Sequence, residues 1–88
     1  FYRTEAGAEV DLIVQRPGKS WLALEVKATQ RPSASLCSGL LSFAEIMPKA
    51  ELFLACRVDR PQLFKFGKQT VRALPWLDCL KMISGESA

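Results

Sequence analysis

Gly7-Ala8-Glu9-Val10-Asp11 and Glu25-Val26-Lys27 are the two stretches that decide the fold of this chain. Each lies at one end of an apolar run with the length and composition of a β-strand, residues 9–15 and residues 21–27. Between the two runs stands Arg16-Pro17-Gly18-Lys19-Ser20, whose Pro-Gly pair is a turn signal. Together they predict a β-hairpin that brings the two acidic segments side by side.

The register of this hairpin decides which side chains meet, because successive side chains of a strand point to opposite faces. A turn centred on Gly18 predicts one apolar layer of three cross-strand pairs: Val10 with Val26, Leu12 with Leu24, and Val14 with Leu22. On the other face it sets Asp11 opposite Glu25 and Glu9 opposite Lys27. A shift of one residue would bring charges into the apolar layer, whereas a shift of two keeps the faces and pairs Asp11 with Lys27. We prefer the register centred on Gly18, and the shift of two stays open.

Two carboxylates that face each other at about 5 Å repel, so positive charge must compensate them. A divalent metal ion is one interpretation, because hard cations such as Mg²⁺ take carboxylate oxygens as ligands. The other is a surface salt-bridge cluster, in which Lys27 and Arg3 neutralise Glu9, Asp11 and Glu25. Spacing alone favours the salt-bridge cluster, because short motifs produce many false matches.

The rest of the chain predicts an α/β domain built around the hairpin. Ser33 is a good N-cap for a helix over residues 34–47 that is ended by Pro48 and carries an apolar stripe: Leu36, Leu40, Phe43 and Met47. Residues 51–56 predict a central strand, and the intervening helix predicts a right-handed βαβ crossover with parallel pairing. Two short edge strands at 64–66 and 69–74 and a helix over 76–83, with Pro75 in its first turn, complete the expected elements.

We therefore expect a mixed β-sheet flanked by helices, in a single domain over residues 1–83 with a frayed tail at 84–88. The composition, with 49% hydrophobic and 24% charged residues, is that of a small globular domain. No apolar run approaches the roughly 20 residues that span a bilayer. Because the chain does not begin with Met, we expect a fragment of a longer protein, and its three widely spaced cysteines indicate a cytoplasmic one.

The cysteine and histidine content limits the kinds of catalytic and metal site that this chain can form. Cys37, Cys56 and Cys79 are far apart in apolar surroundings, which predicts buried, reduced thiols rather than disulfides or a zinc site. The chain contains no histidine, so histidine-based catalytic triads and zinc sites with histidine ligands are excluded within this sequence. Water activated by a metal ion on carboxylates is the hydrolytic chemistry that remains.

Positive charge gathers after Lys27, where eight basic and five acidic residues account for the net charge of +3. Basic and aromatic residues alternate in one part of this region: Arg57, Arg60, Phe64, Lys65, Phe66, Lys68 and Arg72. Two interpretations stay open, a phosphate-binding edge and a solvated strand edge, and the second is the commoner one. The isoelectric point near 9.0 permits DNA binding without indicating it.

The acidic segments, taken with their strands and turn, resemble the core of the PD-(D/E)xK nuclease superfamily. More narrowly, Phe1-Tyr2-Arg3-Thr4, residues 7–11 and residues 25–27 are similar to an uncharacterised domain that follows the ATPase module of many prokaryotic AAA-type ATPases. Residues 39–43 and Leu74-Pro75-Trp76-Leu77 share this likeness. The resemblance implies a restriction-endonuclease-like core that lacks the superfamily's N-terminal helix and the additional acidic residue on it.

The resemblance also implies a function, a Mg²⁺-dependent nuclease domain that hydrolyses phosphodiesters of DNA. Asp11 and Glu25 would bind Mg²⁺ or Mn²⁺ with the Val26 carbonyl as a third ligand, Glu9 would bind a second metal or hold Lys27, and Lys27 would orient the attacking water or stabilise developing charge. Contacts to nucleic acid are expected from a further set: Arg3, Thr4, Gln30 and Arg31, with Thr29 as a weaker candidate. Any use of ATP would belong to an N-terminal ATPase region outside this sequence.

Two other functions compete with this one. The first is a non-catalytic module of the ATPase that binds nucleic acid or docks a protein and retains the acidic cluster for structural reasons. The second is a scaffold or dimerisation domain whose acidic cluster is only a set of surface salt bridges.

Overall fold

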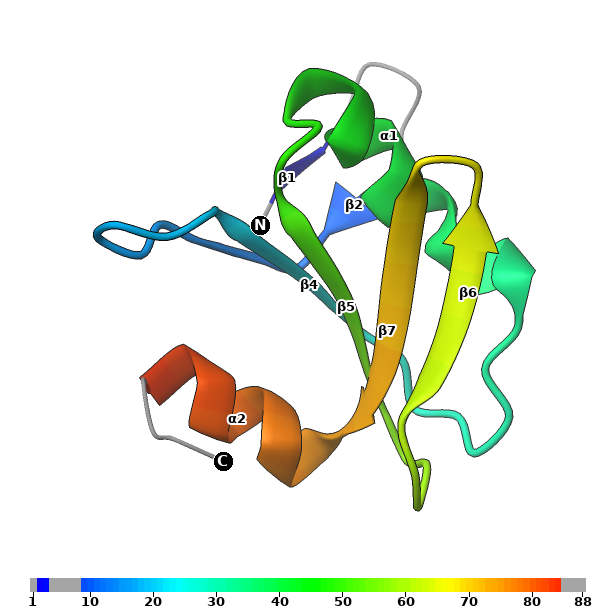
Figure 1. Ribbon diagram of the computed structural model, residues 1–88. Helices are drawn as coiled ribbons and strands as arrows, with labels where there is room; N and C mark the ends of the chain where they lie inside the picture. The colour runs from blue at the N-terminus through cyan, green and yellow to red at the C-terminus, as the bar shows by residue number, and fades with distance from the viewer. Residues whose placement is uncertain (1, 4–8, 85–88) are drawn as a thin grey trace.

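The fold is described for residues 2–3 and 9–84 in a computed structural model (Figure 1). Its strands are β1 (Tyr2–Arg3), β2 (Glu9–Val10), β3 (Leu12–Val14), β4 (Leu22–Val26), β5 (Glu51–Cys56), β6 (Gln62–Phe66) and β7 (Gln69–Pro75). Its helices are the 3₁₀-helix η1 (Ala34–Cys37) and the α-helices α1 (Ser38–Ile46) and α2 (Trp76–Ser84). Within these ranges no helix is both long and apolar enough to cross a membrane.

Five strands form a mixed sheet in the order β3-β4-β5-β7-β6, which confirms the predicted α/β class. The inner strands β4, β5 and β7 run parallel, whereas β3 and β6 pair antiparallel at the two edges. The chain passes from β4 to β5 through η1 and α1, so the predicted parallel pairing of these strands is confirmed. The predicted edge position of β7 is wrong, because β6 pairs along its outer side.

The β3–β4 hairpin has the predicted register, with Leu12 opposite Leu24 and Val14 opposite Leu22. Its turn is closed by a 3.1 Å hydrogen bond from the Lys19 N–H to the Arg16 carbonyl. Gly18 stands at φ +71°, the conformation that a type II turn needs at its third residue and that glycine adopts without steric cost. The Pro-Gly pair therefore sets the register of the hairpin.

A bend at Asp11 divides the predicted strand 9–15 into β2 and β3. β2 leaves the main sheet and pairs with β1, so that Glu9 lies opposite Arg3 and not opposite Lys27. The predicted apolar layer is also wrong at Val10. Beyond the bend the alternation of faces changes, and Val10 packs with the cluster on the opposite side of the sheet from Leu22 and Leu24.

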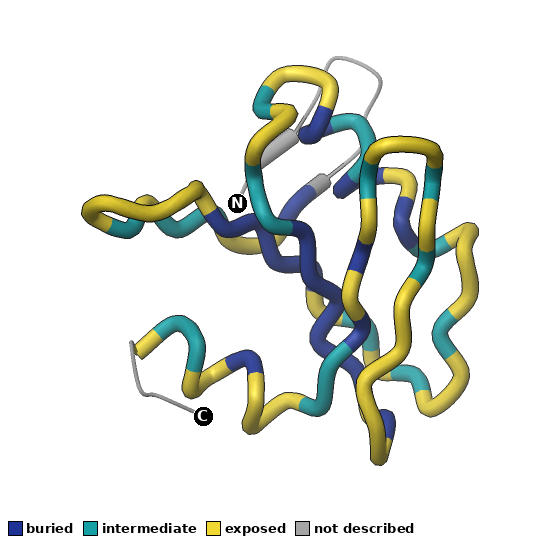
Figure 2. The backbone as a smooth tube through the Cα atoms, viewed as in Figure 1, coloured by how far each residue is buried: buried dark blue, intermediate teal, exposed yellow. Residues whose placement is uncertain are grey.

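The core lies on both faces of the sheet and is centred on β5 (Figure 2). Alternate residues of β5 point to opposite sides: Leu52 and Leu54 toward the cluster that contains α1, Phe53 and Ala55 toward the cluster that contains α2. A strand covered on both faces must be apolar throughout, which is why residues 51–56 lack the alternation of a half-exposed strand.

The first helix differs from its predicted range at its start, whereas the second begins at the predicted residue and only Pro75 lies in β7 instead of its first turn. The predicted helix over 34–47 begins as η1, and Ser33 at its N-cap makes no capping hydrogen bond with its side chain, since its hydroxyl hydrogen-bonds Ser35 instead. α2 begins at Trp76, immediately after Pro75 ends β7. Of the predicted tail, Ser84 is the last residue of α2, and residues 85–88 lie outside the described residues.

Candidate active site

The Asp11 carboxylate lies against the end of β4. The bend between β2 and β3 turns this side chain toward the neighbouring strand, where its Oδ2 accepts a 2.8 Å hydrogen bond from the Val26 N–H. That N–H belongs to the peptide bond between Glu25 and Val26, so Asp11 is brought next to the backbone of the Glu-Val-Lys segment. The two acidic segments that are 14 residues apart in sequence therefore meet in the fold.

Glu25 is a buried charged residue, only 7% exposed, and it lies near the end of β4. It shares a face of this strand with Ala23, which belongs to the cluster beneath α1. Lys27 Nζ lies 3.0 Å from Glu25 Oε2, and the lysine side chain is 40% exposed. Burial of a carboxylate is costly unless positive charge or hydrogen bonds compensate it, and Lys27 supplies a cation at contact distance.

Cys37 is a buried thiol that lies near the Glu25 carboxylate. Burial raises the pKa of Cys37 to about 11, and the nearby Glu25 carboxylate and the Cys56 thiol act in the same direction. A thiol with such a pKa stays protonated at neutral pH and is a poor nucleophile. All three cysteines are buried and free, as predicted, and Cys37 is no candidate for nucleophilic catalysis.

The donor set can be tested against the needs of a metal ion. Among the described side chains, which do not include that of Glu9, no group of three or more Asp, Glu, Cys or His residues converges. Mg²⁺ does not require such a group, because it commonly uses one or two carboxylates together with water and substrate phosphate. Asp11 and Glu25 on neighbouring strand ends supply two carboxylates, and hard oxygen ligands of this kind fit Mg²⁺ or Mn²⁺.

The loop that follows β4 is anchored by its backbone. The Lys27 N–H donates to the Ala55 carbonyl at 2.9 Å, and the Arg57 N–H donates to the Thr29 carbonyl at 2.8 Å. The Thr29 hydroxyl also accepts a 3.1 Å hydrogen bond from the Arg31 N–H. Thr29 thus shapes the loop, and residues 27–31 are held alongside the end of β5.

Two of the four residues predicted to contact nucleic acid line one pocket. Gln30 and Arg31 border a cavity of about 430 Å³ at the end of the sheet, together with five residues from the segment after β5: Arg57, Val58, Asp59, Arg60 and Gln62. The charge pattern of the sequence indicates Arg57 and Arg60 as candidate phosphate contacts. It does not indicate that they line the same pocket as Arg31, or that Gln62 lines it too. Of the other two, Arg3 contributes its backbone to β1, and Thr4 lies outside the described residues.

A family model described as "Domain of unknown function (DUF4143)" matches residues 1–77 of the chain. The match includes β1 to β7 and the first residues of α2. The search of curated proteins and the search of solved structures each gave no match.

Proposed function

The chain belongs to the DUF4143 family, whose description states no activity, and from the site geometry we propose that it is a metal-dependent phosphodiesterase module acting on DNA. The observation that carries the proposal is the hydrogen bond from the Val26 N–H to Asp11, which joins one acidic segment to the other. We further propose that the module works as the C-terminal part of an AAA-type ATPase, as the resemblance of its motifs implies.

In this proposal Asp11 and Glu25 hold a Mg²⁺ or Mn²⁺ ion, with Glu9 as a further ligand. The ion, when bound, would supply a Lewis acid that lowers the pKa of water and neutralises phosphate charge. Lys27 lies at contact distance from Glu25, so its ammonium group is placed to orient a water molecule and to stabilise negative charge on a phosphate. Its 40% exposed side chain leaves it accessible to a substrate from solvent.

A second candidate function is a non-catalytic module of the same ATPase that binds nucleic acid. The observation in its favour is the pocket lined by three arginines, which does not depend on a metal ion. Under this alternative the Glu25–Lys27 pair only compensates a buried charge, and Asp11 only caps the N–H of Val26.

Metal binding by the full-length protein tests the proposal first. We expect Mn²⁺ titrations followed by calorimetry to show binding that weakens at least about tenfold in Asp11→Asn and in Glu25→Gln, because each variant removes a charged oxygen ligand. Asp78→Asn is the matched control, since Asp78 is an exposed carboxylate on α2. Equal Mn²⁺ affinity in all four proteins would refute the metal site.

Cleavage of plasmid or branched DNA by the full-length protein then separates the two functions. We expect Mg²⁺-dependent cleavage that Lys27→Gln abolishes while Mn²⁺ binding persists, because Lys27 acts on water and phosphate rather than on the metal. Circular dichroism shows whether that variant is folded. Metal binding without cleavage under these conditions would leave the non-catalytic module as the function.

A further inference from the structure

The pocket at the end of the sheet is built by segments that follow two parallel strands. Gln30 and Arg31 come after β4, Arg57 and Arg60 come after β5, and Gln62 opens β6. Since β4 and β5 are parallel, the loops that follow them lie at the same end of the sheet, where Figure 1 shows them next to each other. Crevices at the carboxyl ends of parallel strands are the usual ligand sites of α/β sheets.

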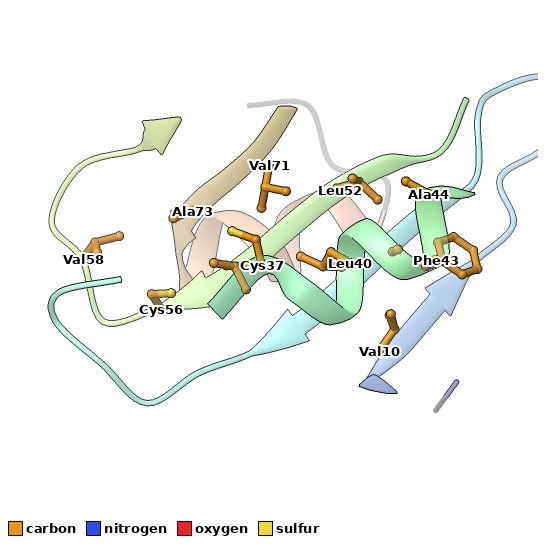
Figure 3. Packing of buried hydrophobic residues seen from close by; sticks show 12 residues of the cluster. Val10, Cys37, Leu40, Phe43, Ala44, Leu52, Cys56, Val58, Val71 and Ala73 are labelled. Carbon is orange, nitrogen blue, oxygen red and sulfur yellow. The ribbon is translucent and has the colours of Figure 1, made fainter. Parts of the chain in front are cut away.

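Val58 fixes the segment that carries two of the arginines. It is only 7% exposed and belongs to the core cluster beneath α1, at the end where Figure 3 also places Cys56 and Ala73. With Val58 held in the core, its neighbours Arg57 and Asp59 are exposed, as is Arg60. The loop of residues 57–61 is therefore anchored at its centre, and its charged side chains stand at the pocket.

The charge of the pocket favours an anion. Three guanidinium groups and one carboxylate line it, and within the described part of the chain none of these arginines forms an ion pair. Guanidinium presents several N–H donors in a planar fork that matches the oxygens of a phosphate, and the amides of Gln30 and Gln62 add neutral donors. A cavity of about 430 Å³ accommodates a phosphate group with part of its neighbouring sugar.

We propose that this pocket, which we call the arginine pocket (Arg31, Arg57 and Arg60 with Gln30 and Gln62), binds a backbone phosphate of a nucleic-acid strand. This inference rests on the proposed action on DNA, and it names the residues that hold the strand. Lys27 and Gln30 belong to the same loop after β4, so a strand held in the arginine pocket runs along the sheet edge that carries the candidate active site.

Fluorescence anisotropy of a short labelled DNA strand, titrated with full-length protein in EDTA, tests the arginine pocket without catalysis. We expect Arg57→Gln/Arg60→Gln to weaken binding by about tenfold or more and to reduce the slope of log K against log salt by about 0.7, since the pocket holds one phosphate and each phosphate contact on a single strand contributes about 0.7. Lys65→Gln/Lys68→Gln is the matched control, because it removes the same charge from exposed positions on β6 and the β6–β7 turn. We expect that control to change the salt slope little.

Two results would overturn the inference. One is an equal loss of affinity in the arginine and lysine variants, which would indicate net charge rather than a site. The other is an affinity for the DNA strand that Arg57→Gln/Arg60→Gln leaves unchanged. If this variant nevertheless loses binding of inorganic pyrophosphate, the arginine pocket is a site for free phosphate compounds and the inference is equally overturned.

The same measurements separate this inference from the proposed function. We expect strand binding to persist in EDTA, because the guanidinium groups of the arginine pocket contact phosphate without a metal ion. Strand binding that depends on the arginines, without Mg²⁺-dependent cleavage, would support the arginine pocket and refute the hydrolase. Mg²⁺-dependent cleavage whose kinetics are the same in Arg57→Gln/Arg60→Gln and in the unmodified protein would support the hydrolase and refute the arginine pocket.

Discussion

Glu25 and Lys27 form an ion pair that is half inside the protein and half in solvent. The carboxylate is almost fully buried, while the lysine reaches it from a position that solvent also reaches. Such a pair resists separation, because water solvates the buried partner poorly once the cation is removed. The same cation is the group that the proposed mechanism places beside a phosphate.

Replacing Lys27 by Met should lower the free energy of unfolding by about 1–2 kcal/mol, less than the 3–5 kcal/mol of a fully buried pair because the lysine is partly solvated. Urea denaturation of Lys27→Met measures this, with Lys19→Met in the exposed turn as the control. Adding Glu25→Gln should recover part of the loss, since the buried group then carries no charge. An unchanged urea midpoint in Lys27→Met would contradict this account.

The buried thiols predict a loss of stability at alkaline pH. Burial raises the pKa values of Cys37 and Cys79 from 9.0 to about 11 in the folded chain, with Asp78 adding to the effect at Cys79. Between these pH values the unfolded chain releases the thiol protons and the folded chain keeps them, so the free energy of unfolding falls as pH rises. Cys37→Ala/Cys79→Ala should flatten this fall between about pH 9 and 11 in urea titrations. Parallel pH curves for the two proteins would refute it.

Among the elements, the β3–β4 hairpin depends on the turn that joins its two strands. The Pro-Gly turn ends β3 and starts β4 in the register that places Leu12 opposite Leu24. Arg16 reinforces the turn, because its guanidinium donates hydrogen bonds to the Ser20 carbonyl at 3.0 and 3.2 Å and forms an ion pair with Glu51 at the start of β5. The hairpin is thereby tied to its parallel neighbour.

Gly18→Ala should destabilise the protein by about 1 kcal/mol, because an L-residue with a Cβ adopts a positive φ only at a steric cost. No atom lies within 4 Å of the Cβ that would be added, so the expected loss comes from backbone conformation rather than from a clash. Thermal unfolding compares this variant with Lys19→Ala in the same turn, which should change little. Equal melting temperatures for the two variants would disprove the role assigned to the turn.

The whole molecule is a sheet covered on both faces, and β5 joins the two core clusters. Leu54 is fully buried beneath α1, while Phe53 next to it is 2% exposed on the side of α2. The clusters therefore share one strand, and loss of packing on either face weakens the support of the other. The candidate active site lies at the end of β4, and the arginine pocket lies beyond the ends of β4 and β5.

Truncation of Leu54 to Ala should cost about 2–5 kcal/mol, because it opens a cavity where packing is close on all sides. Leu63→Ala removes the same atoms from β6 at a residue that is 57% exposed, and it should cost less than about 0.5 kcal/mol. Urea denaturation measures both variants. Similar losses in the two would show that the assigned core is wrong.

The sequence alone determined the features that depend on neighbouring residues. Gly18 in its Pro-Gly turn favoured the observed hairpin register over a shift of two residues, and an apolar run without alternation marked β5 as a central strand, because turn geometry and side-chain alternation act over a few residues. The tertiary structure decided the rest. The bend at Asp11 carries Val10 to the other face, and packing of distant segments brings Arg31 to Arg57 and Arg60 in one pocket. Contacts between residues that are far apart in the sequence depend on how the helices pack on the sheet, and no local sequence pattern encodes them.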